Sequence, residues 1–274
     1  MTKGYLFRVY IQRFLRGCFP MLTITPIPAF SDNYIWMGVL DDRAWVVDPG
    51  DAAPVLAMLQ SRGLTLDTIL ITHHHFDHTG GVNELKAATR CRVVGPNNPK
   101  ISDIDDVVVD GDRATVLGVE FEVLGVPGHT LDHIAYYNQS ESTLFCGDTL
   151  FVGGCGRVFE GTFPMMQGSL AKLKALPQTT KVYCTHEYTL ANLAFAQKVE
   201  PDNAVLAEHA RNCAALRERD IPTVPSSIEV ECAINPFLRW DSDEIIANLV
   251  ANRQLDSRTP ADVFAAVRGW KDEG

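Results

Sequence analysis

The chain has 274 residues, of which 46% are hydrophobic and 21% are charged, so it can bury a core large enough for one big domain or two moderate ones. Its net charge of −10, from 24 basic and 34 acidic side chains, argues against a general nucleic-acid-binding protein, which needs a basic surface. No apolar run reaches the roughly 18 residues needed to cross a bilayer, so we expect no membrane partner.

The first twenty residues are basic: Lys3, Arg8, Arg13 and Arg16 occur without a single acid. They lack a clean apolar region and a small-residue cleavage site, so a secretory signal is not expected. We interpret residues 1–20 as a disordered or artefactual extension in preference to a transit peptide, with the folded chain starting at Met21. The seven cysteines show no Cys-x-x-Cys spacing and are expected to be free thiols, which indicates a reducing, cytoplasmic location.

Residues 21–187 have the pattern of short strands with helices between them. Strands are expected at 35–40, 44–47, 67–72, 92–94, 107–109, 119–126, 133–138, 143–146 and 181–184. Helices are expected at 53–62, where Gly63 follows as a favourable C-terminal cap, and at 82–88. Because helices between strands must cover both faces of a sheet, this region predicts layered α/β packing.

From Tyr188 onward the hydrophobic period becomes helical. Helices are predicted at 189–200 and 203–220, separated by Pro201, and at 242–252 and 261–270. A proline-containing loop is predicted at 222–236 between the two pairs. We therefore expect residues 188–274 to form an all-α second domain.

Histidines are concentrated in the segment Thr-His-His-His-Phe-Asp-His at 72–78, between a predicted strand and a predicted helix. His73, His75 and Asp77 are two residues apart, so in an extended segment they share one side, while His78 needs the turn to bring it to them. Imidazole and carboxylate groups suit zinc and other divalent transition metals. A solvated polar loop is the less favoured alternative, and His74 and Phe76, out of phase, are interpreted as packing or solvent-exposed residues.

Three more residues of ligand type each follow a predicted strand: His129, Asp148 and His186. Three such strand ends beside the main cluster are unlikely by chance. His133 either orients a ligand or is simply a polar residue at a strand start. Asp48, which ends another strand, is interpreted as a buried structural carboxylate near the metals.

Together these segments supply seven candidate ligands, which are too many for one tetrahedral zinc but suit two metals that share a bridging carboxylate. The candidates are His73, His75, Asp77, His78, His129, Asp148 and His186. Two divalent ions are therefore expected, most simply zinc, with iron or manganese as alternatives. Such a site indicates hydrolysis by a metal-held hydroxide.

The Thr-His-x-His-x-Asp-His motif, with Pro-Gly-His-Thr at 127–130 and Phe-Cys-Gly-Asp-Thr at 145–149, resembles the metallo-β-lactamase superfamily. More narrowly, the chain resembles glyoxalase II, the hydroxyacylglutathione hydrolases, in the segments 153–157, 159–162, 185–189 and 235–239. The resemblance extends from Met21 to about Lys271. It implies a metallo-β-lactamase-like αββα sandwich at 21–187, followed by a C-terminal all-α, substrate-binding domain at 188–274.

The resemblance also implies individual roles. One metal takes His73, His75 and His129, the other takes Asp77, His78 and His186, and Asp148 bridges them, with Asp77 and Asp148 as the catalytic residues. Glutathione is expected against Arg157, Phe159, Tyr188, Arg268 and Lys271. Arg157 stands where the family often has lysine, which keeps the charge, whereas Phe159 stands where tyrosine is common and so lacks a hydroxyl. The three cations suit the two carboxylates of glutathione, although Arg268 and Lys271 alone would be interpreted as ordinary surface charge.

The implied reaction is hydrolysis of S-(2-hydroxyacyl)glutathione, typically S-D-lactoylglutathione, to glutathione and D-lactate. This is the last step of glutathione-dependent methylglyoxal detoxification. A hydroxide bridging the two metals is expected to attack the thioester carbonyl, and the only partner expected of this monomer is its small-molecule substrate. The alternatives are a persulfide dioxygenase, which uses one iron and lacks the helical tail, or another hydrolase or nuclease of the metallo-β-lactamase fold.

Overall fold

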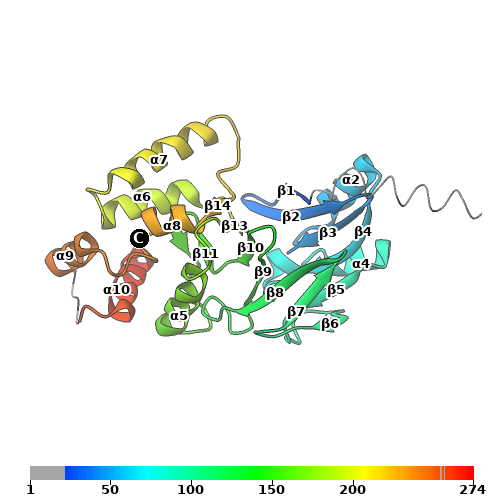
Figure 1. The fold of residues 1–274 in the computed structure, drawn as a ribbon, viewed down its shortest axis with the longest axis horizontal. Helices are drawn as coiled ribbons and strands as arrows, with labels where there is room; N and C mark the ends of the chain where they lie inside the picture. The colour runs from blue at the N-terminus through cyan, green and yellow to red at the C-terminus, as the bar shows by residue number, and fades with distance from the viewer. Residues whose placement is uncertain (1–21, 254, 256) are drawn as a thin grey trace, which may run out of the picture.

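The computed structural model describes residues 22–253, 255 and 257–274, and the interpretation of residues 1–20 lies outside them. Two six-stranded sheets pack face to face at its centre (Figure 1). The first has the order β1 (Thr23–Ala29), β2 (Asn33–Leu40), β3 (Arg43–Val47), β4 (Thr65–Leu70), β5 (Arg92–Gly95) and β6 (Asp106–Val107). The second has the order β14 (Ser226–Ser227), β13 (Lys181–Cys184), β10 (Thr143–Gly147), β9 (Ile134–Asn138), β8 (Val119–Gly125) and β7 (Arg113–Val116).

The first sheet is buried on both faces because its central strands alternate two sets of apolar residues. Trp36 and Trp45 face the second sheet, where Trp45 meets the rings of Phe121 and Phe145 edge-on, each at a centroid distance of 5.3 Å. Met37 and its outward-facing neighbours instead form a second apolar cluster. Helices α2 (Ala52–Arg62) and α4 (Val82–Thr89) cover that cluster, and Gly63 caps α2 in the left-handed conformation, as predicted.

The remaining helices share the apolar cluster of the second sheet, and those after residue 188 gather at one end of the molecule (Figure 1). Helix α5 (Phe163–Lys174) comes before residue 188. The helices after it are α6 (Thr189–Val199), α7 (Ala204–Arg217), α8 (Ile228–Ile234), α9 (Asp243–Asn252) and α10 (Pro260–Glu273). One continuous apolar cluster joins the space between the sheets to Met166 and Leu170 of α5 and to Phe237 and Phe264 beyond. The predicted αββα layers followed by a helical region are confirmed. No helix in the described part of the chain has the length and apolar character to span a membrane.

The prediction of a loop over 222–236 is wrong, because β14 and α8 lie within it. Three prolines, at 222, 225 and 236, suggested the loop, but they flank a stretch long enough for two helical turns. Ser227 begins α8 by accepting a hydrogen bond from the amide of Val230 at 3.2 Å, which is ordinary N-capping. Helix α5 and strand β7 were not predicted. The short hairpin of β11 (Leu150–Phe151) and β12 (Gly154–Cys155) is likewise not predicted from the sequence.

The directions of the strands explain why the residues of ligand type lie at one edge of the sandwich. β10 is parallel to β13, and β8 runs the same way because β9 is antiparallel to both β8 and β10. The carboxyl ends of these three strands therefore meet at one edge of the second sheet. The end of β4 reaches the same place, since the amide of Ile134 donates to the carbonyl of Thr72 at 2.9 Å.

Candidate dinuclear metal centre

A buried carboxylate organises the turn that follows β4. Asp48 is 2% exposed, and its two oxygens accept hydrogen bonds from the Thr72 amide at 2.7 Å and the Thr72 hydroxyl at 2.8 Å. The chain then turns into the single-turn helix α3 (Phe76–Thr79), which swings His78 back toward His73, with 4.0 Å between the ring centroids. The turn therefore supplies the rotation that His78 needs to join the other ligand candidates.

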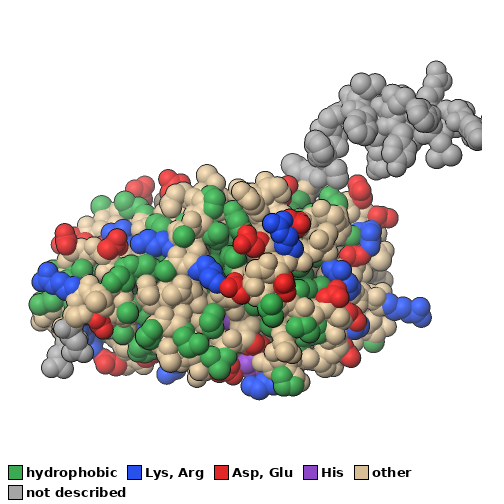
Figure 2. Space-filling view, turned by 60° about the horizontal axis from the view of Figure 1, so that its bottom comes forward, with side chains coloured by type: hydrophobic (Ala, Val, Ile, Leu, Met, Phe, Trp, Pro, Cys, Tyr) green, Lys and Arg blue, Asp and Glu red, His purple; other side chains and the backbone are tan. Residues whose placement is uncertain are grey.

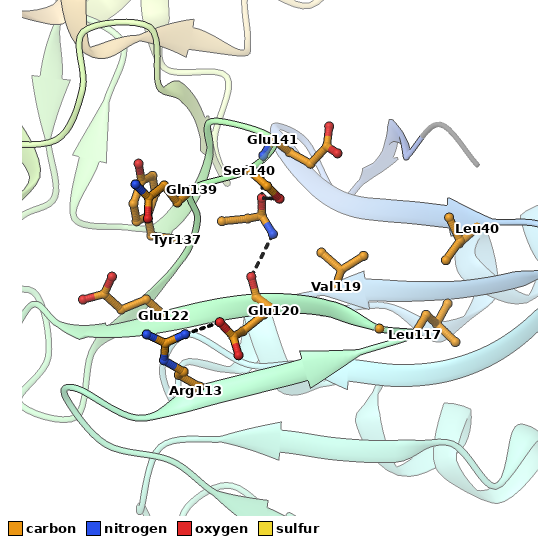
Figure 3. A pocket seen from close by; sticks show the side chains of 12 residues that line it. Leu40, Arg113, Leu117, Val119, Glu120, Glu122, Tyr137, Gln139, Ser140 and Glu141 are labelled. Carbon is orange, nitrogen blue, oxygen red and sulfur yellow. Dashed lines mark hydrogen bonds and ion pairs between the residues drawn. The ribbon is translucent and has the colours of Figure 1, made fainter. Parts of the chain in front are cut away.

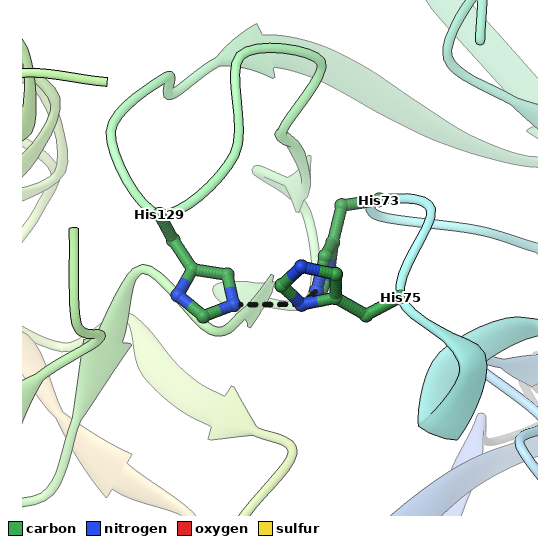
Figure 4. A group of neighbouring side chains, drawn as sticks. All are labelled: His73, His75 and His129. Carbon is green, nitrogen blue, oxygen red and sulfur yellow. Dashed lines mark hydrogen bonds between the residues drawn. The ribbon is translucent and has the colours of Figure 1, made fainter. Parts of the chain in front are cut away.

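The first group of ligand candidates consists of His73, His75 and His129 (Figure 4). Nδ1 of His75 lies 3.1 Å from Nε2 of His73 and 3.1 Å from Nε2 of His129. His129 points its other nitrogen, Nδ1, at the carbonyl oxygen of Arg157, 2.7 Å away. A carbonyl can only accept, so Nδ1 carries the proton and Nε2 is left with its lone pair toward the group.

The second group consists of Asp77, His78 and His186. Oδ2 of Asp77 lies 3.4 Å from Nε2 of His186 and 3.5 Å from Nε2 of His78. On its far side, Nδ1 of His186 donates to Oδ1 of Asp32 at 2.7 Å. This bond fixes the His186 tautomer so that Nε2 faces the group with its lone pair.

Asp148 stands between the two groups and reaches both. Its Oδ2 is 3.4 Å from Nε2 of His129 in the first group and 3.3 Å from Nε2 of His186 in the second. Its Oδ1 is 3.4 Å from Nε2 of His78. The structure therefore brings all seven predicted ligand candidates together, and Asp148 is the carboxylate placed to be shared.

His133 orients Asp148 through the backbone. Its ring is 1% exposed, its Nδ1 donates to the Ile134 carbonyl at 3.1 Å, and its Nε2 accepts from the Asp148 amide at 3.1 Å. Burial lowers the pKa of His133 to about 3, so the ring stays neutral and keeps the lone pair that this second bond requires. Gly147, with φ +48°, leaves no room for a side chain, since a Cβ would lie 2.4 Å from the Thr72 hydroxyl. Of the two sequence interpretations of His133, the ligand-orienting one fits the structure.

These residues fit divalent metal ions. Metal–nitrogen bonds of 2.0–2.1 Å in a tetrahedron separate neighbouring ligand atoms by about 3.3 Å, close to the separations found here. Within the described residues, two buried polar atoms at the centre, Nε2 of His78 and Oδ1 of Asp148, have no hydrogen-bond partner. Burial disfavours a charged His186, yet the Asp148 and Asp77 carboxylates raise the pKa of His186 to about 10, which shows that the centre stabilises positive charge.

His74 belongs to a separate cluster. It is 8% exposed, with Nδ1 2.9 Å from Asp132 Oδ1 and Nε2 3.0 Å from the Lys100 ammonium. Glu160 completes the cluster, 3.4 Å from His74 and 3.6 Å from Lys100. The Lys100 ammonium thus places a positive charge beside these carboxylates. His74 lies in a buried polar cluster, while Phe76 is 74% exposed.

The predicted substrate-binding residues lie beside the metal centre in two sets. Tyr188 stacks on His186, with ring planes 1° apart and centroids 4.6 Å apart, while the Phe159 ring lies 5.3 Å from His129. The second set consists of cations: Arg157 and Arg268 both approach Asp272, and Lys271 donates to Asn192. Arg268 is 4% exposed, so its interpretation as ordinary surface charge, taken alone, is wrong.

The surface and the pockets agree with a recessed centre. Figure 2 shows only small areas of histidine, low on the face in view, beside acidic side chains. A pocket of about 560 Å³ adjoins the second group and is lined by Asp32, Asn33 and Tyr188 among others. Another pocket, of about 630 Å³, lies around the start of β8, the end opposite the metal centre, where Arg113 pairs with Glu120 (Figure 3). That pocket contains no candidate ligand.

Sequence reasoning missed two residues of the centre, Asp32 and Asn33. Asp32 orients His186, and the Asn33 amide donates to Oδ2 of Asp77 at 3.0 Å. Asp32 lies in the turn between β1 and β2 and Asn33 begins β2, about 150 residues before His186. Nothing in their own spacing indicates a role, although Asp-Asn before an apolar strand does mark a turn that could carry one.

Comparison with known proteins agrees with the fold. Residues 30–186 match the metallo-beta-lactamase superfamily model, and residues 187–274 match the model for the hydroxyacylglutathione hydrolase C-terminus. A hydroxyacylglutathione hydrolase of Pseudomonas aeruginosa is 53% identical over 257 residues, covering 92% of this chain and 100% of the relative. That of Chromohalobacter salexigens is 53% identical over 255 residues, covering 92% and 99%.

Among solved structures, the crystal structure of ETHE1 from Myxococcus xanthus aligns with a TM-score of 0.62 and 27% identity, over 93% of this chain and 99% of that one. The match to that structure supports the shared architecture, while the curated relatives are about twice as similar in sequence. With the metallo-beta-lactamase model covering more than half of the chain and these relatives covering nearly all of it, the chain belongs to the metallo-β-lactamase superfamily and, within it, to the hydroxyacylglutathione hydrolases.

Proposed function

We propose that this protein hydrolyses the thioester of S-(2-hydroxyacyl)glutathione, typically S-D-lactoylglutathione, to glutathione and a 2-hydroxy acid, here D-lactate. This reaction is the last step of glutathione-dependent methylglyoxal detoxification. One observation carries the proposal: a seven-ligand centre lies next to a cluster of cations, Arg157, Arg268 and Lys271, on the chain of a hydroxyacylglutathione hydrolase. The first feature suits hydrolysis, and the second suits the carboxylates of glutathione.

We propose two divalent metal ions, one held by His73, His75 and His129 and the other by Asp77, His78 and His186, with Asp148 shared. Bound there, the ions supply a water molecule of lowered pKa and polarise the substrate carbonyl. Five imidazoles and two carboxylates suit zinc well, and the same donors accept iron or manganese. Zinc is our choice because four-coordinate sites rich in histidine are typical of it.

The protein's own residues orient the reacting groups. Asp148 approaches both groups and Asp77 approaches His78 and His186 of the second group. These carboxylates can accept a hydrogen bond from a water molecule or hydroxide and hold that nucleophile in one orientation. Asn33 donates to Asp77, His133 accepts from the amide of Asp148, and Asp32 orients His186. When the acyl carbon–sulfur bond breaks, glutathione leaves as a thiolate. A thiol of pKa about 8.5 is a good leaving group, so no acid residue is needed to protonate it.

We further propose that two parts of the chain contribute different residues to the site. Residues 21–187 supply the metal ligands together with Arg157 and Phe159, and residues 188–274 supply Tyr188, Arg268 and Lys271. Arg268 and Lys271 are one turn apart on α10, and the guanidinium of Arg268 reaches the carbonyl of Cys155 at 3.3 Å. This contact brings α10 against the turn that leads to Arg157, so cations from both parts can bind one glutathione molecule.

The lowered pKa of Lys271 predicts that substrate binding depends on pH. Burial lowers its pKa to about 8, with Cys155, Arg268 and Asp272 as the neighbouring groups that titrate or carry charge. Since the charged form exists below this pKa, carboxylate binding is favoured below about pH 8 and weakens above it. We expect kcat/KM, which reports the free enzyme, to fall as the pH rises through about 8. Values of kcat/KM measured between about pH 6.5 and 10, at intervals of about half a pH unit, check this prediction.

The control for this profile is Lys271→Arg, because arginine keeps its charge throughout that range. The variant should flatten the alkaline fall that Lys271 causes, leaving only the titration of the substrate's own amino group. An identical fall in both proteins would assign the profile to some group other than Lys271.

The proposed activity is tested with metal-replete protein and S-D-lactoylglutathione. Release of free thiol is followed over time, and oxygen uptake with glutathione persulfide is measured in parallel. Rapid thiol release without oxygen uptake supports the thioesterase. Oxygen uptake without thioester hydrolysis would favour a persulfide dioxygenase instead.

We also propose that the protein acts as a monomer in the cytoplasm. Six cysteines in the described residues are free thiols, five of them buried, which suits a reducing compartment. Every residue proposed to bind metal or substrate comes from one chain. Light scattering on the purified protein, with and without metal, tests the monomer directly.

A further inference from the structure

The hairpin β11–β12 connects the metal centre to the helical region. It follows Asp148 and leads into Gly156 and Arg157, whose carbonyl accepts the hydrogen bond from His129. At Gly156 a Cβ would lie 2.0 Å from the Asp148 carbonyl oxygen, so the chain there is pressed against the centre. Any shift of the hairpin therefore moves the Arg157 side chain relative to α10.

Buried polar side chains of the helical region hold this hairpin. Glu231 of α8 is 0% exposed and accepts, at its Oε2, the amide of Gly153 at 2.9 Å and the side-chain amide of Asn235 at 2.9 Å. Its other oxygen accepts from the Ser226 hydroxyl. Asn235 also donates to the Gly154 carbonyl at 2.9 Å. On the other side, the Asn192 amide donates to the carbonyl of Val152 at 3.1 Å.

Packing alone does not explain why the carboxyl group of Glu231 is buried in this network. Burying a carboxyl is costly unless hydrogen bonds or a cation compensate, and no ion pair in the described residues includes Glu231. Burial raises the pKa of Glu231 to about 7, in keeping with a carboxyl held by three donors and no cation. An apolar side chain would fill the same space at lower cost, but it would leave the Gly153 amide without its acceptor.

We propose that Glu231 is a positioning residue for substrate binding: by fixing the β11–β12 hairpin against α8, it sets the spacing between Arg157 and the cations Arg268 and Lys271. This inference rests on the proposed function, since it concerns capture of the glutathione part of that substrate. Glu231 touches neither metal ligands nor the reacting atoms, so its effect falls on affinity and leaves the chemical step intact. The hydrogen bonds by which Glu231 holds the hairpin are the same whichever substrate the protein binds.

The test compares Glu231→Ala with Glu231→Gln. Alanine removes the acceptor, and we expect KM for S-D-lactoylglutathione to rise roughly tenfold, with kcat within about threefold and both metal ions retained. Glutamine is expected to restore most of the affinity. Its carbonyl can accept from Gly153 and Asn235, and the Ser226 hydroxyl can rotate to accept from its amide.

Glu200→Ala is the matched control. Glu200 is likewise buried, at 2% exposure, but it accepts from Arg239, Ser242 and Asn203 inside the helical region and does not touch the hairpin. Its loss should lower the melting temperature without changing KM. If Glu231→Ala lowers only the melting temperature, or raises KM no more than Glu200→Ala does, the positioning role is wrong. An equal rise of KM in Glu231→Gln would also overturn it, since hydrogen-bond geometry would then not be the cause.

Two further measurements keep the inference testable. If Glu231→Ala does not fold, Glu231→Asp withdraws the carboxylate by one methylene and should raise KM about threefold. Hydrogen exchange at residues 151–157 gives a readout that needs no substrate, and faster exchange there in Glu231→Ala than in Glu231→Gln or the unaltered protein supports the proposal. Unchanged exchange contradicts it. A wild-type protein that fails to hydrolyse the thioester would overturn the proposed function while this exchange experiment still tests the hairpin.

Discussion

Replacing Asp148 with asparagine should lower kcat/KM for S-D-lactoylglutathione by about 10³-fold or more and leave fewer than two metal ions per chain. Asp148 is the only residue of the seven whose oxygens approach members of both groups, His129 in one and His78 and His186 in the other. An amide keeps the size of the side chain but removes the negative charge that offsets two cations. Metal content by plasma mass spectrometry, together with initial rates, measures both effects.

Asp132→Asn is the matched control for this variant. Asp132 is a nearby carboxylate that pairs with His74 and Asn98 and, within the described residues, forms no ion pair with any of the seven ligand candidates. It should keep two metals and most of the activity. If Asp148→Asn also kept two metals and full activity, the assignment of Asp148 as the shared ligand would be wrong.

Lys271→Met should raise KM for the same substrate by roughly 10- to 150-fold while leaving kcat and metal content nearly unchanged. The range corresponds to about 1.5–3 kcal/mol for a hydrogen bond to a charged group. The ammonium of Lys271 lies over the rings of Phe195 and Phe237, at 5.5 and 5.7 Å from their centroids. Methionine removes this charge but has a long, flexible apolar side chain that can pack against the same rings. Steady-state kinetics over a wide substrate range separates KM from kcat.

Lys198→Met serves as its control, since Lys198 is an exposed lysine in the last turn of α6, away from the hairpin. It loses the same charge from the same region and should leave KM unaltered. A lower kcat with unchanged KM in Lys271→Met would mean that Lys271 acts on the chemical step, contrary to its proposed role in binding.

Much of the fold could be predicted because local patterns and tertiary structure agree. The strands that carry the ligands, β4, β8, β10 and β13, each finish in a short apolar run followed by glycine or threonine, and each lies within two residues of its expected bounds. Because the ends of strands that run in the same direction meet at one edge of a sheet, residues that follow such strands can be placed together from the sequence alone. The same logic found His129, Asp148 and His186.

The segments that were missed depend on contacts distant in sequence. Helix α8 is seven residues long between prolines, and it is stable because Glu231 and Asn235 bond to the β11–β12 hairpin about 80 residues earlier. Asp32 likewise acquires its role only when His186, 154 residues later, lies beside it. A local sequence pattern does not indicate partners that are so distant in the chain.

The substrate-binding residues show a different limit. Arg268 and Lys271 have the spacing and charge of an ordinary solvated helix face, and only the family resemblance singled them out. Burial of Arg268, with its guanidinium against Cys155 and over the Phe237 ring at 5.2 Å, results from how α10 packs. Charge in a sequence does not reveal whether a side chain is buried.

We propose that seven residues form one centre for two metal ions and that this centre hydrolyses a glutathione thioester. Titration of zinc into metal-depleted protein, with S-D-lactoylglutathione hydrolysis and bound metal measured at each step, tests it most directly. We expect full activity to require binding of two zinc ions per chain, with both lost together in Asp148→Asn. Full activity with a single bound ion, or no thioester hydrolysis with two, would contradict it.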